Sequence, residues 1–133
     1  MKEIQTTCAY CGVGCGIDVS ISQGSPVSLN GSPTHPANHG RLCVKGTHLL
    51  DTLGEDHRML APKVKGKVTD WDTAITTVAE RFSQTIAEYG ADSVAFYVSG
   101  QLLTEDYYVA NKLMKGYIGS ANIDTNSRLC MSS

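Results

Sequence analysis

The chain has 133 residues, and its 11 basic and 13 acidic side chains give a formal net charge of -2. A hydrophobic fraction of 41% with 18% charged residues is that of a globular protein, which argues against a disordered chain, a collagen or a membrane protein. The near-neutral charge gives no electrostatic reason to expect binding to nucleic acid or to a membrane surface.

The start of the chain carries no visible targeting signal. The segment that leads from Met1 to Cys8 has neither the apolar run of a signal peptide nor a twin arginine. We therefore expect a cytoplasmic protein, whose thiols are kept reduced and available to metals. The chain stops soon after Cys130 without a polar tail, and we expect it to be cut from a longer protein.

Residues 1–57 predict a small, loop-rich β module. Residues 17–21 alternate apolar and polar side chains, as in a half-buried strand, and residues 27–29 repeat the pattern briefly. The Gly-Ser-Pro turn at residues 24–26 would join the two strands as a hairpin. This module has too little apolar material for a core of its own, so we expect a metal or disulfides to hold it together.

Residues 58–133 predict alternating helices and strands. A helix is expected to begin after Asp70 as N-cap and to end at Gly90, because its apolar residues recur at spacings of three and four. These apolar residues are Trp71, Ala74, Ile75, Val78, Ala79, Phe82, Ile86 and Tyr89.

A second round of the same pattern follows this helix. Residues 93–98 form an apolar run suited to a buried parallel strand, and residues 121–124 predict another strand. Between them, a helix capped at residues 104–106 is expected to run to Gly119. Helix, strand, helix and strand in this order indicate the start of a doubly wound α/β sheet, so the fold class of the whole chain is α+β with an α/β second part. The apolar side of the second helix is expected to comprise Tyr107, Ala110, Leu113, Met114, Tyr117 and Ile118.

Four of the five cysteines form the densest motif. Cys8, Cys11 and Cys15 are separated by two and then three residues, and Cys43 follows after a further 27. Three close thiolates in a glycine-rich loop can surround one side of an iron–sulfur cubane, and a distant fourth can complete the ligand set. The glycines of the loop would let backbone amides approach the cluster sulfur atoms.

Two other interpretations of these cysteines remain. A structural zinc would usually show two paired C-x-x-C units, and here the second pair is missing. Two disulfides would need an oxidising compartment, against which the expected cytoplasmic location argues. The spacing therefore favours an iron–sulfur cluster over a zinc site and over disulfides.

Two further residues have ambiguous local signals. Lys45 lies two residues after Cys43, where a lysine is ordinarily a solvated surface residue. Cys130 follows the second predicted strand, so it is a metal ligand, a nucleophile or a buried apolar residue. The four histidines show no ligand spacing and are interpreted as loop or surface residues; they are His35, His39, His48 and His57.

Taken together, this pattern resembles the molybdopterin oxidoreductases, the bis-pterin molybdenum enzymes related to dimethyl sulfoxide reductase. The cysteine motif looks like the family's four-iron four-sulfur module over residues 1–57, and residues 58–133 look like the truncated start of its α/β domain. Residues 124–133 are most similar to the corresponding segment of assimilatory and periplasmic nitrate reductases. Formate dehydrogenases are the nearest competitor, but they typically have histidine where this chain has Met131.

The resemblance implies roles for individual residues. Cys8, Cys11, Cys15 and Cys43 would hold a 4Fe-4S cluster, and Cys130 would be the protein ligand to molybdenum of a bis(molybdopterin guanine dinucleotide) cofactor. Lys45, Gln101 and Asn126 would contact the cofactor, with Lys45 between the cluster and a pterin on the electron route.

The resemblance also implies a function for the full-length protein. It would reduce nitrate to nitrite in the cytoplasm, with electrons from ferredoxin, flavodoxin or an NAD(P)H-dependent reductase subunit. We expect the 133-residue chain to be inactive by itself, because a bis-pterin cofactor needs several domains. The alternatives are a formate dehydrogenase, a stand-alone iron–sulfur electron-transfer module and, more weakly, a zinc-stapled interaction domain.

Overall fold

The computed structural model describes residues 1–56 and 58–126, so the prediction for Cys130 falls outside the described residues. The described chain forms two compact units that are interleaved in the sequence. The first comprises Met1–Gly54, Ser99–Tyr108 and Asn126, and the second comprises Glu55–Val98 and Val109–Thr125. The mixture of strands and helices in these units confirms the predicted α+β fold class.

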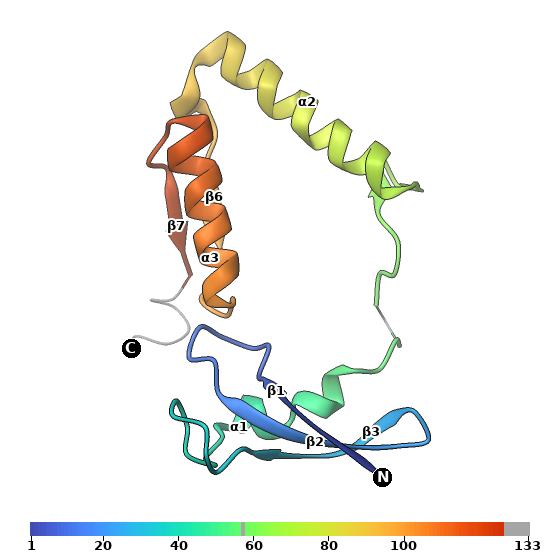
Figure 1. The fold of residues 1–133 in the computed structure, drawn as a ribbon. Coiled ribbons are helices and arrows are strands. Elements are labelled where there is room, and N and C mark those ends of the chain that lie inside the picture. The colour runs from blue at the N-terminus through green and yellow to red at the C-terminus, as the bar shows by residue number, and fades with distance from the viewer. Residues whose placement is uncertain (57, 127–133) are drawn as a thin grey trace. The chain divides into compact units, whose positions relative to one another are not determined.

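The first unit is built on a three-stranded antiparallel sheet (Figure 1). Strand β2 (Gly16–Ser22) lies between β1 (Lys2–Thr7) and β3 (Ser25–Gly31), and pairs Thr6 opposite Ile17 on one side and Gly31 opposite Ile17 on the other. The predicted hairpin of β2 and β3 is confirmed. Strand β1 was not predicted, because it is an exposed edge strand with mostly polar side chains and no apolar alternation.

Two short helices complete this unit. Helix α1 (Val44–Thr47) and the 3₁₀ helix η1 (Leu49–Thr52) follow a loop that leaves β3. Four residues are too few for a helical apolar periodicity, which is why the sequence did not reveal either one. The core here is small, since Cys8 and Ile17 are the buried apolar residues among those described in this unit.

The second unit begins with a small hairpin and a long helix. Strands β4 (Lys63–Val64) and β5 (Lys67–Val68) pair antiparallel across a two-residue turn. Helix α2 (Trp71–Tyr89) has the predicted bounds. The side chain of its N-cap Asp70 accepts a hydrogen bond from the Thr73 N–H at 2.7 Å, and Gly90 ends the helix with a positive φ of 87°.

The apolar face of α2 lines a groove rather than a closed core. Trp71 and Val78 remain 66% and 59% exposed among the described residues. One contact with the rest of the unit is made by Phe82, whose ring meets the Phe96 ring edge to face at 6.0 Å between centroids. The groove is lined mainly by Trp71, Ala74, Ile75, Val78, Ala79, Phe82, Ile86, Phe96, Leu113 and Ile118.

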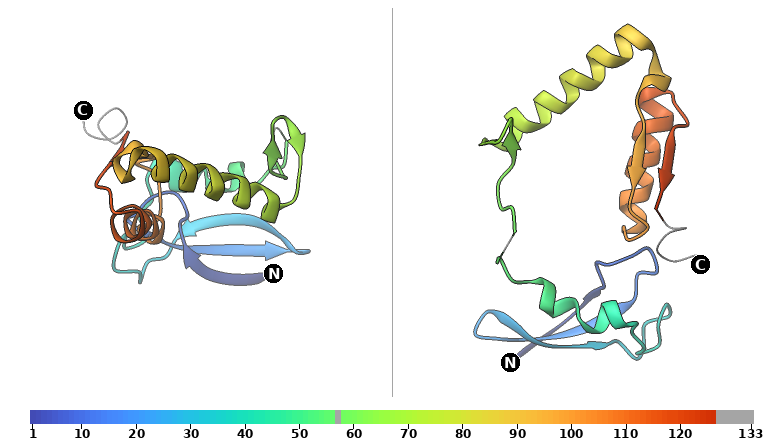
Figure 2. Two further views of the ribbon diagram at one scale, coloured as in Figure 1. Left: turned by 90° about the horizontal axis from the view of Figure 1, so that it is seen from above. Right: turned by 180° about the vertical axis from the view of Figure 1, so that it is seen from behind.

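A strand, a helix and a second strand form the last part of the described chain. Strand β6 (Phe96–Val98) pairs parallel with β7 (Ile123–Thr125), and the two lie side by side in Figure 2. This pair confirms the predicted parallel connection. Both strands are three residues long. The first starts later than predicted, and its first predicted residue, Ser93, belongs to the 3₁₀ helix η2 (Ala91–Ser93).

The helix between these strands differs from its prediction. It is α-helical as α3 (Thr104–Asn111) and continues as the π-helix η3 (Lys112–Ile118) before Gly119 ends it with a φ of 82°. Met114 is fully buried, whereas the predicted apolar residue Tyr117 is 75% exposed, because the wider π turns carry it off the buried stripe. No helix in the described parts of the chain is both long and apolar enough to cross a membrane.

The cap of α2 gives a pH-dependent prediction. The N–H of Thr73, together with its hydroxyl, holds the pKa of Asp70 below its usual value of 3.8. Because the pKa is lowered in the folded state, the carboxylate stabilises the helix fully above pH 3.8, and this stabilisation is lost as the pH falls through the folded-state value. Asp70→Ala should therefore lower the melting temperature at pH 7, and the difference from the parent should shrink in acid.

Thermal unfolding followed by far-UV circular dichroism measures this effect. Asp70→Asn is the control, since asparagine caps a helix as well as aspartate does. It should keep most of the melting temperature at pH 7. Equal losses for the alanine and asparagine variants would contradict the capping role.

Candidate functional site

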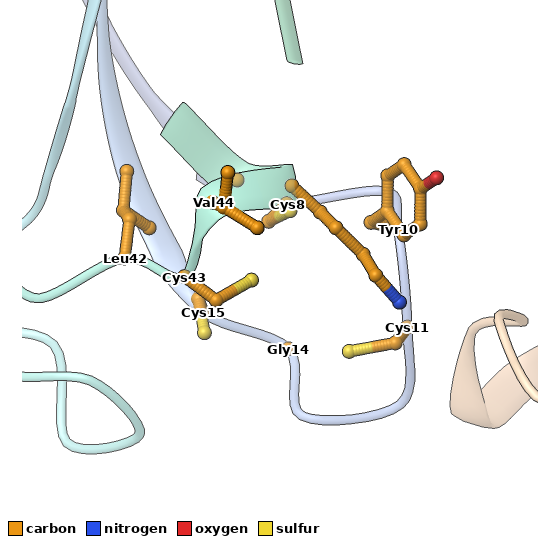
Figure 3. A pocket seen from close by; sticks show the side chains of 10 residues that line it. Cys8, Tyr10, Cys11, Gly14, Cys15, Leu42, Cys43 and Val44 are labelled. Atoms are coloured by element: carbon orange, nitrogen blue, oxygen red, sulfur yellow. The ribbon is translucent and has the colours of Figure 1, made fainter. Parts of the chain in front are cut away.

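Four cysteines of the first unit line a single cavity of about 120 Å³. All four have free thiols. Figure 3 shows the sulfur atoms of Cys11, Cys15 and Cys43 directed into the same space, with Cys8 behind them. The fold thus brings together the four thiols that the sequence motif singled out.

The first three thiols lie on the loop that joins β1 to β2. Cys8 follows the last residue of β1, and Cys15 precedes the first residue of β2. The Cys8 N–H donates to the Cys15 carbonyl at 2.8 Å, which closes the loop at its base. At its tip, Gly14 adopts a φ of 65°, which favours glycine and turns the chain back toward the cavity. The paired strands therefore fix both ends of the three-cysteine loop.

Cys43 is brought to this loop by a buried asparagine. The Asn38 side chain accepts a hydrogen bond from the Gly16 N–H at 2.8 Å and donates to the Gly16 carbonyl at 3.0 Å. It also donates to the Arg41 carbonyl at 2.9 Å. Gly16 follows Cys15 and Arg41 lies two residues before Cys43, so one side chain ties together the two segments that carry the cysteines.

Close backbone packing supports the same arrangement. A Cβ atom added to Gly31 would lie 2.3 Å from the Gly40 carbonyl oxygen, a distance that no real contact allows. The Gly40 N–H donates to the Ser32 carbonyl at 2.9 Å, and the Ser32 N–H donates to the Gly16 carbonyl at 2.9 Å. The end of β3 and the loop that leads to Cys43 can therefore approach this closely only with glycine at position 31.

Charge on one thiol of the cavity changes the pKa of a neighbouring thiol. Burial raises the pKa of Cys15, and negative charge on Cys8, Cys11 and Cys43 raises it further. The pKa of Cys43 is lowered, chiefly by the N–H of Gly46 that faces its sulfur, against a smaller effect of burial. Four thiolates this close repel each other, so a bound cation or a metal cluster would relieve that repulsion.

The residues fit an iron–sulfur cluster. Four thiolates are the usual ligand set of a 4Fe-4S cluster. A space of about 10–15 Å³ holds one water molecule, so a cavity of about 120 Å³ has room for a group of several atoms. Within the described residues, no three histidine, cysteine or acidic side chains are grouped so as to hold a single metal ion.

Lys45 and Tyr10 lie on the wall of the same cavity. The Lys45 ammonium nitrogen is 5.3 Å from the centroid of the Tyr10 ring, within range of a cation–π interaction. Both side chains are half-buried. The structure therefore places Lys45 beside the four thiols rather than on the open surface.

The other two predicted contact residues lie together in the first unit. Gln101 and Asn126 follow strands β6 and β7 in the sequence. The Asn126 side-chain oxygen accepts a hydrogen bond from the Gly100 N–H at 2.7 Å, which joins the two strand-end segments. The segment after β6 also reaches the cysteine loop, because the Thr104 hydroxyl donates to the Gly12 carbonyl at 3.2 Å.

Sequence reasoning missed two residues of this site. Asn38 lies in a turn-rich segment, and nothing in its spacing indicated that it would be buried against Gly16. Tyr10 lies between two of the cysteines, but its pairing with Lys45 joins residues that are far apart in the sequence. An aromatic residue inside a ligand motif and a cation just after the last ligand were the available signals.

Two family models match the chain. The model described as the molybdopterin oxidoreductase Fe4S4 domain matches residues 1–54, which include the cysteine loop and Cys43. The model described as molybdopterin oxidoreductase matches residues 58–133. Together the two matches cover nearly the whole chain.

The chain is also similar to curated proteins named nitrate reductase. It is 58% identical over 133 residues to one from Klebsiella oxytoca, covering 100% of this chain and 15% of the relative. It is 54% identical over 141 residues to one from Shewanella frigidimarina, with the same two coverages. A protein named periplasmic nitrate reductase from Desulfovibrio desulfuricans is 44% identical over 138 residues, covering 99% of this chain and 18% of the relative. The chain thus spans less than a fifth of the length of these relatives.

The role of Asn38 can be tested by truncation. Asn38→Ala would remove the side-chain acceptor of the buried Gly16 N–H, whereas the Gly16 carbonyl would keep the Ser32 N–H as a donor. An unsatisfied buried polar group costs about 1–3 kcal/mol. We expect a loss of stability of that order, measured by urea unfolding, and a lower iron content in the purified protein. Full iron content and unchanged stability would contradict the tethering role.

The close packing at Gly31 makes a second prediction. Gly31→Ala should displace the loop that leads to Cys43 and so reduce the amount of cluster retained after anaerobic purification. Gly54→Ala is the matched control, because a Cβ at Gly54 would meet no atom within 4 Å. Absorbance and iron analysis compare the two, and equal retention would show that the loop tolerates the shift.

Proposed function

Since the chain belongs to the molybdopterin oxidoreductase family, we propose that it forms part of a nitrate reductase and carries electrons toward its molybdenum centre. The cofactors of this family are a 4Fe-4S cluster and a molybdopterin cofactor, matched here over residues 1–54 and 58–133. The relatives named nitrate reductase support the choice of nitrate within the family.

The observation that carries the proposal is the convergence of four thiols on one cavity. In the proposal, Cys8, Cys11, Cys15 and Cys43 are the four ligands of the cluster. The closed base of the β1–β2 loop holds the first three in place, and Asn38 holds the segment of the fourth. Rigid ligands of this kind limit the rearrangement that accompanies each electron transfer.

We assign the remaining predicted residues to the cofactor side of the electron route. Lys45 supplies a positive charge beside the cysteine cavity, where it would face a pterin. Gln101 and Asn126 would contact the cofactor from the joined segments that follow β6 and β7. Cys130, outside the described residues, would be the protein ligand to molybdenum, held by two molybdopterin guanine dinucleotides. When bound, the molybdenum cofactor supplies the transfer of one oxygen atom from nitrate, which consumes two electrons and two protons and gives nitrite and water.

The physiological setting is part of the same proposal. The relatives at 58% and 54% identity are named nitrate reductase without a compartment, whereas the relative at 44% is named periplasmic. We also propose an assimilatory, cytoplasmic enzyme that receives electrons from ferredoxin, flavodoxin or an NAD(P)H-dependent subunit. Cell fractionation locates the enzyme, and recovery of its activity in the periplasmic fraction would reject this setting.

Cluster chemistry and nitrate reduction test the proposal together. The anaerobically purified enzyme that contains this sequence should hold about four irons with acid-labile sulfide in this module. Cys43→Ser should lose most of that iron and reduce nitrate turnover with a reduced dye at least tenfold. Iron, sulfide and nitrite assays provide the measurements.

A neighbouring variant provides the control. Val13→Ala changes an exposed side chain between Cys11 and Cys15, so it should keep both iron and activity. One zinc and no iron at this site would reject the cluster. Full iron with formate oxidation but no nitrate reduction would instead identify a formate dehydrogenase.

A further inference from the structure

We propose that Tyr10 is a positioning residue for Lys45: its ring holds the lysine ammonium at the wall of the cysteine cavity, where the charge raises the reduction potential of the bound cluster. This inference rests on the proposed function, since it concerns a cluster held by the four cysteines. It assigns a role to a side chain that is neither a metal ligand nor one of the predicted cofactor contacts.

The geometry of the pair is the first support. The Lys45 ammonium nitrogen lies 5.3 Å from the centroid of the Tyr10 ring. A cation is attracted to the negative face of an aromatic ring at distances up to about 6 Å. Both residues line the cysteine cavity and are half-buried, so water screens their interaction less than it would at an open surface.

The places of the two residues in the chain are the second support. Tyr10 lies on the β1–β2 loop between Cys8 and Cys11, and Lys45 lies in α1 just after Cys43. The pair therefore connects the segment that carries three of the thiols with the segment that carries the fourth. Figure 3 shows the Tyr10 ring on the same side of the cavity as Cys11.

The Lys45 charge stays at one position beside the cluster only if another group, here the Tyr10 ring, holds the ammonium in place. A lysine ammonium sits on a flexible four-carbon stem with many rotamers. The Lys45 side chain lines the same cavity as the four thiols, so its charge lies close to the expected cluster. An electron that enters the cluster adds a negative charge, and a nearby cation stabilises this reduced state more than the oxidised one. Holding the cation in place therefore raises the reduction potential.

The test measures the cluster potential in the holoenzyme that contains this sequence. Dithionite supplies electrons one at a time, and the reduced cluster is followed by electron paramagnetic resonance. Lys45→Gln should shift the potential to a more negative value. Tyr10→Leu should shift it in the same direction and by no more than Lys45→Gln does. Tyr10→Phe, which keeps the ring and loses the hydroxyl, should retain the parent potential.

A double variant separates positioning from a general structural effect. If Tyr10 acts through Lys45, Tyr10→Leu should cause no further shift in the Lys45→Gln background. Tyr117→Leu is the matched control, because Tyr117 is an exposed tyrosine in the other unit. It should leave the potential unchanged. Should Tyr10→Leu fail to retain the cluster, Tyr10→Met serves in its place, since methionine fills irregular space without an aromatic face.

Three results would overturn the inference. They are an unchanged potential in Tyr10→Leu with the cluster intact, an equal shift in Tyr10→Phe, and a shift that persists in the Lys45→Gln background. Iron and sulfide analysis of the parent enzyme distinguishes a failure of the Tyr10 inference from a failure of the proposed function. A parent without iron rejects the cluster itself, whereas a parent with its full cluster and an unresponsive Tyr10 rejects the positioning role alone.

Discussion

The first unit depends on one constraint: a cysteine from a distant segment must be held against a loop that already carries three. Asn38 meets it with hydrogen bonds to both backbone groups of Gly16 and to the Arg41 carbonyl. Gly31 allows the backbones to approach closely enough for these bonds to form. This unit has few buried apolar residues. Polar contacts therefore fix the positions of the cysteine-bearing segments, which a larger hydrophobic core would otherwise fix.

The same arrangement explains the electrostatics of the cavity. Burial raises the pKa of Cys15, and repulsion from the neighbouring thiolates of Cys8, Cys11 and Cys43 raises it further. The pKa of Cys43 is lowered instead, by the N–H groups that face it and by Lys45. The cavity therefore combines four thiols that can carry negative charge with N–H groups and a lysine that offset this charge. This is what an electron-carrying cluster requires, because its charge changes with every electron.

The second unit supplies two strands whose ends lead into the segments that carry Gln101 and Asn126. β6 and β7 are paired in parallel, and the residue after β7, Asn126, binds the backbone of the segment after β6. Parallel strands place their carboxyl ends at one edge, where open α/β sheets bind ligands. The apolar groove along α2 has a different place in the fold, since it lies on the helix face and not at this edge.

By itself, the sequence determined the features that depend on local spacing. The cysteine intervals singled out the four thiols that line one cavity, the alternation at residues 17–21 predicted β2, and Asp70 and Gly90 marked the ends of α2. Only the tertiary structure showed that β1 closes the cysteine loop and that Tyr10 faces Lys45. It alone also showed that Asn38 binds the segment that leads to Cys43. The physical reason is distance along the chain. Each of these contacts joins residues that are far apart in the sequence and that no periodicity relates, so only the packing of backbone and side chains in space determines which residues meet.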